Sequence, residues 1–129
     1  MTADEELIDL LEAFCAAFAA QDADTMRALF DDDAVCFIGS DSLVLHDRDH
    51  LVRFLDEYSA QRVSFSFEWD ACQVSGGDRA GWVSAFGREL QHDGDRTTTE
   101  PFRITLVCNR RDDGWRIAHL HGSKPHADQ

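Results

Sequence analysis

The stretch FRITLVCNRRDDGWRIAHLHGSKP, residues Phe102 to Pro125, has the pattern of a β-hairpin. Apolar side chains recur at every second position on both sides of Asp112-Asp113-Gly114, which is a turn sequence. Alternate residues of a strand point to the same face. We therefore predict two antiparallel strands, over residues 102–109 and 115–121.

Two more strands are predicted upstream of this hairpin. In residues 63–71 Val, Phe, Phe, Trp and Ala alternate with Ser, Ser, Glu and Asp. A turn sequence at Gly76-Gly77-Asp78 precedes a strand over residues 82–90, and Asp93-Gly94 marks the next hairpin. Four long strands joined by short turns predict an antiparallel sheet.

The first sixty residues follow helical spacing instead. Apolar residues three and four apart predict an amphipathic helix over residues 4–20 and a third helix that begins after Asp47 or Asp49. A short helix, capped by Asp22 or Asp24, is predicted between them. The apolar runs 35–38 and 43–45 could each be a strand. This order predicts one α+β domain over residues 1–129, with helices packed on one face of the sheet.

The composition argues against several classes of partner. The chain has 129 residues and a formal charge of −13, from 12 Lys and Arg against 25 Asp and Glu. Because a phosphate backbone or an anionic lipid surface would be repelled, we expect no nucleic-acid or membrane binding. No apolar stretch reaches the roughly 20 residues of a membrane helix, and no export signal is evident, so we expect a cytoplasmic protein. Its four widely spaced cysteines are predicted to be small buried side chains in a reducing compartment.

Both faces of the later strands carry apolar groups, so one face is left without a cover. One face of strand 102–109 holds Phe102, Ile104, Leu106 and Cys108. The opposite face holds Arg103, Thr105 and Val107. Since the helices can cover only one face and twofold dimers are the commonest soluble assembly, we predict a homodimer through the sheet.

The stretch 102–125 also resembles the closing hairpin of SnoaL-like domains in the nuclear transport factor 2-like superfamily. Its pattern R-x-T, basic pair, D-G, W-x-I-x-H-x-H-x-S-x-P is similar to the association domain of calcium/calmodulin-dependent protein kinase II and its bacterial single-domain relatives. Residues 16–22 and 28–35 resemble the opening of the superfamily. The resemblance implies a cone-shaped, cystatin-like fold. In it a curved sheet wraps round a long helix, a pocket opens between them, and dimers form through the outer face.

Alternation predicts that four side chains of the last strand share one face: Trp115, Ile117, His119 and His121. If the register of the family holds, the faces of Arg103 and His119 coincide and look into the cone. A guanidinium binds a carboxylate in bidentate fashion, so these residues predict a pocket for a small, anionic, carboxylate-bearing ligand. The predicted ligand-binding residues are Arg103, Thr105, His119, His121, Trp115, Trp69 and His46.

Each of these residues also has a purely structural explanation. Arg103 could form an internal ion pair with Glu89, Glu68 or Glu100. Tryptophans such as Trp69 and Trp115 usually pack in a core. His119 and His121 could bind a metal with His46 or His92 as a third ligand, but no carboxylate or cysteine lies at a matching spacing. We therefore predict structural histidines, no metal and no other cofactor.

Catalysis is left open by the sequence. Ketosteroid isomerase relatives use a Tyr and an Asp, and the resemblance places Phe14 and Ile38 at those positions. Because neither side chain transfers a proton, steroid-isomerase chemistry is not expected. A cofactor-independent lyase or isomerase, such as a dehydratase or cyclase acting on a small hydrophobic or polyketide-like substrate, could still use His46, His119 or Asp41. The third hypothesis is an oligomerisation module without a ligand.

Overall fold

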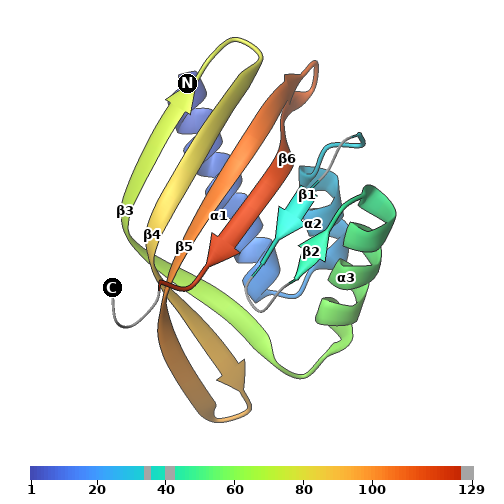
Figure 1. The fold of residues 1–129 in the computed structure, drawn as a ribbon, viewed down its shortest axis with the longest axis vertical. Coiled ribbons are helices and arrows are strands. Elements are labelled where there is room, and N and C mark those ends of the chain that lie inside the picture. Colours follow the sequence, from blue (N-terminus) through green and yellow to red (C-terminus); the bar gives the residue numbers. More distant parts are fainter. Residues whose placement is uncertain (34–35, 40–42, 126–129) are drawn as a thin grey trace.

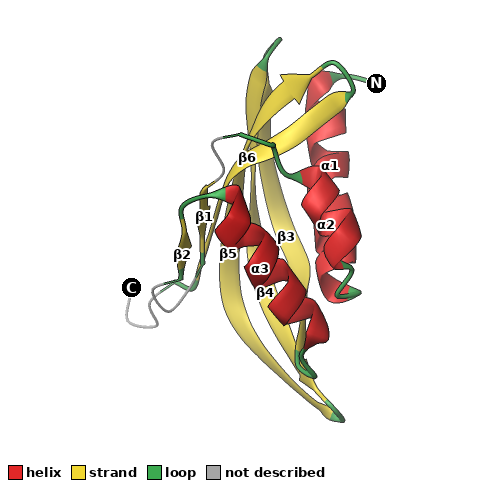
Figure 2. Cartoon of the chain, turned by 90° about the vertical axis from the view of Figure 1, so that its right-hand side faces the viewer, coloured by secondary structure: helices red, strands yellow, loops and turns green. Residues whose placement is uncertain are grey.

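The computed structural model describes residues 1–33, 36–39 and 43–125. Three helices, α1 (Ala3–Ala19), α2 (Ala23–Leu29) and α3 (Arg48–Ala60), lie on one side of a curved sheet (Figures 1 and 2). The strands are β1 (Cys36–Ile38), β2 (Val44–Leu45), β3 (Ser64–Gly76), β4 (Ala80–Asp93), β5 (Arg96–Arg111) and β6 (Gly114–Ser123). They are arranged in the order β2-β1-β6-β5-β4-β3. The predicted α+β fold is confirmed.

One pairing departs from the predicted antiparallel sheet. β1 runs parallel to β6, with Phe37 opposite Leu120, so the sheet is mixed. The parallel direction is set before β1 begins, because Phe30 at the end of α2 already bridges Ile117 in the parallel sense. The predicted strand 35–38 is present from Cys36 onward, and Val35 lies outside the described residues.

Each helix begins at a side chain that caps its free N–H groups. Thr2 and Glu5 form a reciprocal capping box at α1. Asp22 accepts from the N–H of Thr25 at the start of α2, and Asp47 caps α3. The structure thus selects Asp22 and Asp47 from the predicted pairs of caps. Within the described residues, no helix combines the length and apolar character needed to cross a membrane.

The core lies between α1 and the inner face of the sheet. Phe102, Ile104, Leu106 and Cys108 of β5 are buried there. On β6 the alternation is broken, because Val107 pairs with His119 and Cys108 pairs with Ile117, which leaves Ala118 as a bulge. The prediction that Trp115, Ile117, His119 and His121 share one face is therefore wrong. The two residues before the bulge face the helices, and the two histidines face outward.

A buried tyrosine ties the helices to the sheet. The Tyr58 hydroxyl donates to the Phe18 carbonyl at 2.7 Å and accepts from the Phe65 N–H at 2.9 Å. Nearby, the Gln21 side-chain amide donates to the carbonyls of Tyr58 at 2.8 Å and Gln61 at 2.9 Å. These bonds fix the end of α1, the end of α3 and the start of β3 relative to one another.

Tyr58→Phe should lower the free energy of unfolding by about 2 kcal/mol, because the buried Phe18 carbonyl loses its donor and the part-buried Phe65 N–H loses its acceptor. The neighbouring Ser59 supplies a matched control. Its hydroxyl is also buried but has no hydrogen-bond partner among the described residues, so Ser59→Ala should be neutral or stabilising. Urea unfolding of both variants measures the difference. Equal losses would show that the Tyr58 hydroxyl does not hold the elements together.

Candidate functional site

A cavity of about 230 Å³ lies between the helices and the inner face of the sheet. Its apolar wall is mainly aromatic and consists of Phe14, Phe18, Phe37, Phe54, Phe65, Phe67, Phe102, Leu43, Ile104 and Leu120. These side chains come from α1, α3, the sheet and the residue before β2. The polar side chains that the structure describes in the lining are Glu89, Gln91 and Lys124.

The polar lining groups lie together at one end of the cavity. Glu89 and Gln91 are alternate residues of β4, opposite Phe67 and Phe65 of β3. Lys124 follows the last residue of β6, and its Nζ lies 2.5 Å from Glu100 Oε2. In Figure 1 β6 finishes in the lower half of the picture, above the hairpin that joins β4 and β5. The cavity therefore has an aromatic interior and a charged mouth.

Tyr58 is hydrogen-bonded to the backbone of two cavity residues, Phe18 and Phe65, and does not ionise at neutral pH. Burial raises the pKa of its hydroxyl to about 12; the hydrogen bond from the Phe65 N–H opposes that rise, and the Glu89 carboxylate adds to it. The negative charge of Glu89 is thus felt inside the domain. The Tyr58 hydroxyl is already engaged with backbone groups on both sides, so its role is structural.

The predicted arginine and histidines lie outside the cavity. Arg103 and Thr105 share a face of β5 with His119 and His121 of β6, as predicted, but this is the outer face of the sheet. The prediction that they look into the cone is wrong, because Phe102 and Ile104 occupy the inner positions. Arg103 is exposed and donates from Nε to the Ser123 hydroxyl at 3.1 Å. Binding of an anion by this outer group stays a prediction.

The expected ion pairs of Arg103 are not formed. Among the described residues Arg103 has no ion pair, and the structure places Glu68 with Arg88 and Glu100 with Lys124. Arg103 is therefore not the register-fixing partner of an internal carboxylate.

The other predicted residues are dispersed. His46 is exposed, just after β2. Trp115 is buried under the Arg110 guanidinium, which lies 5.8 Å from its ring, and Trp69 stacks on the cavity residue Phe67 at 5.3 Å. Asp41 lies outside the described residues. Of the two positions matched to isomerase catalytic residues, Phe14 lines the cavity and Ile38 lies in β1.

The sequence analysis named Glu89 only as a possible ion-pair partner of Arg103, and it did not predict that Glu89, Gln91 and Lys124 line the cavity. On the inner face of β4 the residues run Val83, Ala85, Gly87 and then Glu89, which puts a charge on an otherwise apolar face. That change of character is a usable signal, because a carboxylate on a helix-facing position must meet a polar group, water or a ligand.

Thiol and metal chemistry find no support in the described residues. Burial raises the pKa of Cys108 to about 12 and that of Cys15 to about 11, so neither is a thiolate at neutral pH. Cys72 is exposed, unlike the predicted buried cysteine. No group of three or more possible metal-ligating side chains occurs in residues 1–33, 36–39 and 43–125.

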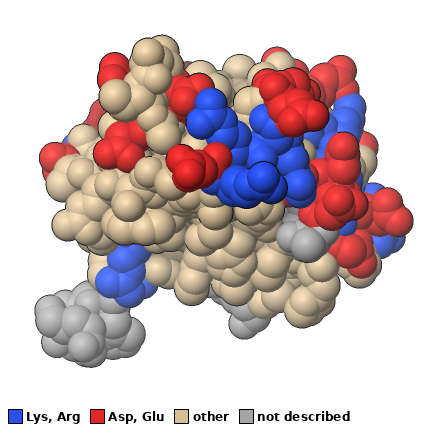
Figure 3. Space-filling view, turned by 90° about the horizontal axis from the view of Figure 1, so that it is seen from above, with Lys and Arg blue, Asp and Glu red and all other residues tan. Residues whose placement is uncertain are grey.

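A second hollow, of about 730 Å³, lies at the opposite end of the molecule, near the β5–β6 turn. Figure 3 shows basic side chains gathered at this end with acidic ones around them. The charged residues that line it are Arg27, Arg48, Arg79, Arg110, Arg111, Arg116, Asp31, Asp32, Asp33, Asp112 and Asp113. We call this the charged groove.

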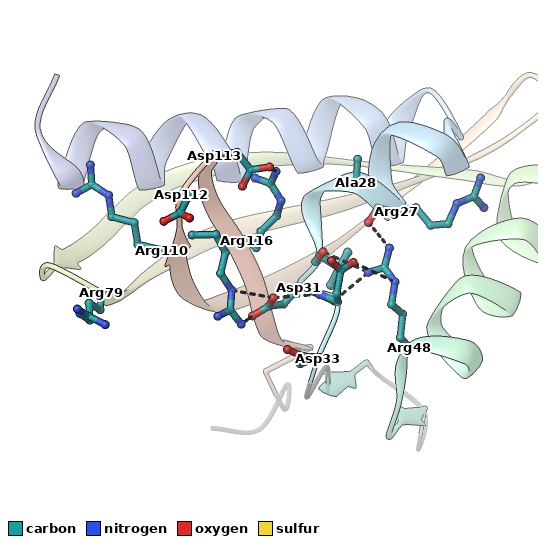
Figure 4. A pocket seen from close by; sticks show the side chains of 13 residues that line it. Arg27, Ala28, Asp31, Asp33, Arg48, Arg79, Arg110, Asp112, Asp113 and Arg116 are labelled. Atoms are coloured by element: carbon teal, nitrogen blue, oxygen red, sulfur yellow. Dashed lines mark hydrogen bonds and ion pairs between the residues drawn. The ribbon is translucent and has the colours of Figure 1, made fainter.

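Most of the charge in the charged groove is used internally (Figure 4). Arg48 donates to the carbonyls of Asp31 at 2.9 Å and Arg27 at 3.1 Å. Asp31 is buried, with a side chain 6% exposed, and its carboxylate accepts from Arg111 Nε at 3.0 Å and Asn109 Nδ2 at 3.1 Å. We infer that the hydrogen bonds and ion pairs of the charged groove join α2 and α3 to the β5–β6 hairpin.

Comparison with known proteins supports one fold family over nearly the whole chain. The family model of the SnoaL-like domain matches residues 7–127. A candidate dehydratase of the nuclear transport factor 2-like family from Streptomyces avermitilis superposes with a TM-score of 0.87 at 22% identity, covering 96% of both chains. No curated protein matches the chain.

Two further solved structures are similar. A candidate calcium/calmodulin-dependent protein kinase type II association domain from Thiobacillus denitrificans has a TM-score of 0.70 at 24% identity, over 91% of this chain and 93% of that one. A ketosteroid isomerase-like protein from Erwinia carotovora atroseptica has a TM-score of 0.75 at 16% identity, over 95% and 96%. At these identities the likeness establishes the fold alone.

Asp31→Asn should lower the free energy of unfolding by about 2 kcal/mol at pH 7, because Arg111 loses a charged partner. Burial alone would raise the pKa of the Asp31 carboxyl, but Arg111 and Asn109 outweigh it and lower that pKa. A lowered folded-state pKa stabilises the fold above the unfolded value of about 3.9 and loses this effect as the pH falls through the folded value. The difference between wild type and variant should therefore shrink toward pH 3.

Denaturant unfolding at several pH values measures this effect. Asp113→Asn is the control, because Asp113 pairs with Arg116 on the surface and is 73% exposed, so its loss should change stability little at any pH. A pH-independent loss in Asp31→Asn would contradict the role of the Asp31 charge.

Proposed function

The chain belongs to the SnoaL-like family, and we propose that it binds a small, largely apolar molecule in the cavity between the helices and the sheet. The observation that carries this proposal is the phenylalanine-lined space with its polar groups confined to one end. Ligand pockets combine apolar walls with a few polar groups that orient the ligand. The cavity has both features.

The size of the cavity limits the ligand. An engineered apolar cavity of about 150 Å³ is large enough to bind benzene, whereas pockets for drug-sized molecules begin at about 300 Å³. At about 230 Å³ this cavity lies between them. A single ring with a short side chain, about ten non-hydrogen atoms in all, suits this volume.

The arginine that was predicted to bind a ligand carboxylate does not line the cavity. Arg103, whose guanidinium suggested it, lies on the outer face. Of the described lining residues, Lys124 is the cationic one, and it already pairs with Glu100. Small-molecule binding therefore rests on the cavity itself and does not depend on an anionic ligand.

A lyase or isomerase is the second candidate function. It is favoured by Glu89, the one carboxyl group in the described lining, because a carboxylate beside an apolar chamber can exchange a proton with a bound carbonyl compound. The names dehydratase and ketosteroid isomerase-like, carried by similar structures, fit that chemistry. Hydrogen exchange at the α-carbon of 4-phenylbutan-2-one in D₂O separates the two functions, because binding alone does not accelerate it.

We also propose that two copies pair through the outer face of the sheet. Three large apolar side chains are exposed there: Trp82 (40%), Phe86 (42%) and Val107 (40%). They lie on the adjacent central strands β4 and β5, so they form one patch. A second copy offers the same patch, which is the self-complementary arrangement of a twofold dimer. An oligomerisation module would use this face too, without needing the cavity.

Filling the cavity should abolish ligand binding. We expect 3-phenylpropan-1-ol to bind the wild-type protein with a dissociation constant of about 1 mM or lower and to raise its melting temperature. Leu43→Trp, which places an indole in the lining, should remove both effects. Val44→Trp is the matched control, because Val44 is the next residue but is exposed and outside the lining. Ligand-detected NMR and thermal melts measure both; equal binding by the two variants would contradict this site.

Phe86→Arg should convert the dimer to a monomer, because a guanidinium would be buried in the centre of the proposed interface. Val44→Arg changes an equally exposed apolar residue at the sheet edge and should leave the dimer intact. Light scattering should give twice the 14.5 kDa chain mass for wild type and control, and one chain mass for Phe86→Arg. A wild-type monomer contradicts the dimer, and a closed assembly larger than a dimer favours the oligomerisation module.

A further inference from the structure

Charged side chains flank Phe86 of β4 on both sides of the outer face of the sheet. Arg103 of β5 lies directly opposite Phe86 in the strand register. On the other side Ala71 of β3 lies opposite Phe86, and the bulge residue Asp70 precedes it. Since β4 lies between β3 and β5 (Figure 1), Arg103 and Asp70 are at the same level on opposite sides of one strand.

The charges on the two sides of β4 are not paired with each other within one chain. Among the described residues Arg103 forms no ion pair, and its Nε donates to the Ser123 hydroxyl at 3.1 Å. Asp70 and Glu68 share the Arg88 guanidinium, at 3.0 Å and 3.2 Å. We call these three residues the acidic cluster, because two carboxylates meet one cation. The outer face thus carries a basic group on one side of β4 and an acidic cluster on the other.

The proposed dimer would cover both groups. Arg103 is exposed in the single chain, but it lies beside Phe86 and would be enclosed together with it. A guanidinium that is removed from water without an anionic partner destabilises an interface. Within the described part of the chain no carboxylate pairs with Arg103, so the partner copy has to supply one.

The aromatic residues of β4 indicate how the two copies are oriented. Trp82 and Phe86 are both exposed on the outer face, and both belong to β4. A twofold axis that runs along β4 brings each of them against its own copy and places β5 of one chain over β3 of the other. Arg103 then lies over the partner's Asp70, because both are at the level of Phe86. Facing sheets are about 10 Å apart, a gap that an arginine and an aspartate side chain can span together.

We propose that two symmetry-related ion pairs hold the dimer in this orientation, each between Arg103 of one copy and the acidic cluster, at Asp70, of the other. This inference rests on the proposed dimer and assigns its specificity-determining residues. The apolar patch supplies the buried area, and the ion pairs select the arrangement in which β5 faces β3. An arrangement that places Arg103 over the partner's Arg103 is disfavoured, because it encloses two like charges.

Charge reversal at the two positions tests the proposal, with light scattering or sedimentation as the measurement. Arg103→Asp gives each contact two acidic sides, and Asp70→Arg gives each contact two basic sides. Each variant alone should therefore have a dimer dissociation constant at least about tenfold higher than that of the wild type. An equimolar mixture of the two variants should recover the dimer, because both contacts of a mixed dimer join an aspartate to an arginine. This recovery would also show that both variants fold.

Two substitutions in α3, on the other side of the sheet, are the controls (Figure 2). Arg53→Asp reverses the charge of an exposed arginine that, like Arg103, has no ion pair among the described residues. Asp56→Arg reverses the charge of an exposed aspartate that, like Asp70, pairs with an arginine of its own chain. Neither control should change the dimer dissociation constant.

The outcomes separate this inference from the dimer itself. A monomeric wild type, or a dimer that Phe86→Arg leaves intact, contradicts both. If Phe86→Arg abolishes the dimer but the two charge reversals leave it as tight as in the wild type, the outer face is the interface and the inferred ion pair is wrong. The ion pair is also wrong if both reversals weaken the dimer and their mixture does not recover it, or if the α3 controls weaken it equally.

Discussion

The spacing of the elements around the cavity depends on hydrogen bonds that join α1, α3 and β3. The Tyr58 hydroxyl joins the Phe18 carbonyl of α1 to the Phe65 N–H of β3, and both of those residues line the cavity. Gln21 repeats the connection by donating to the carbonyls that end α3. A core of phenylalanines would otherwise gain dispersion energy by closing the space. The polar ties resist that closure, since closing it would break buried hydrogen bonds.

The elements could be predicted because each follows from one local rule. Helix caps and helical spacing of apolar residues predict α1 and α3. From residue 63 onward the apolar residues alternate, and this change of spacing is sufficient to predict the four long strands. The direction of β1 could not be predicted in this way. Its parallel pairing depends on where the chain leaves α2, and the Phe30–Ile117 bridge is a long-range contact without a local sequence signature.

The predicted site residues were assigned to the wrong face of the sheet for a different reason. Alternation states that residues share a face, but it does not state which face meets the helices. Arg103 and His119 were grouped correctly and assigned to the wrong side, although Phe102 and Ile104 at the intervening positions argued for the other. The bulge at Ala118 also changes, partway along the last strand, which face the alternate residues occupy. No glycine in the sequence marks the position of this bulge. One extra residue therefore separates Trp115 and Ile117 from the two histidines.

The two ends of the domain differ in how charged and apolar side chains are used, and this contrast supports the proposed ligand site. In the charged groove, Asp31 is matched by Arg111 and Asn109, and Arg48 is bound to backbone carbonyls, so the charges there hold elements of the fold together. At the other end, Glu100 pairs with Lys124 beside an aromatic space. A charged group that fully satisfies its neighbours gains little from a further partner. The charged groove therefore has a structural role, and the apolar cavity at the other end is the place where we propose that a ligand binds.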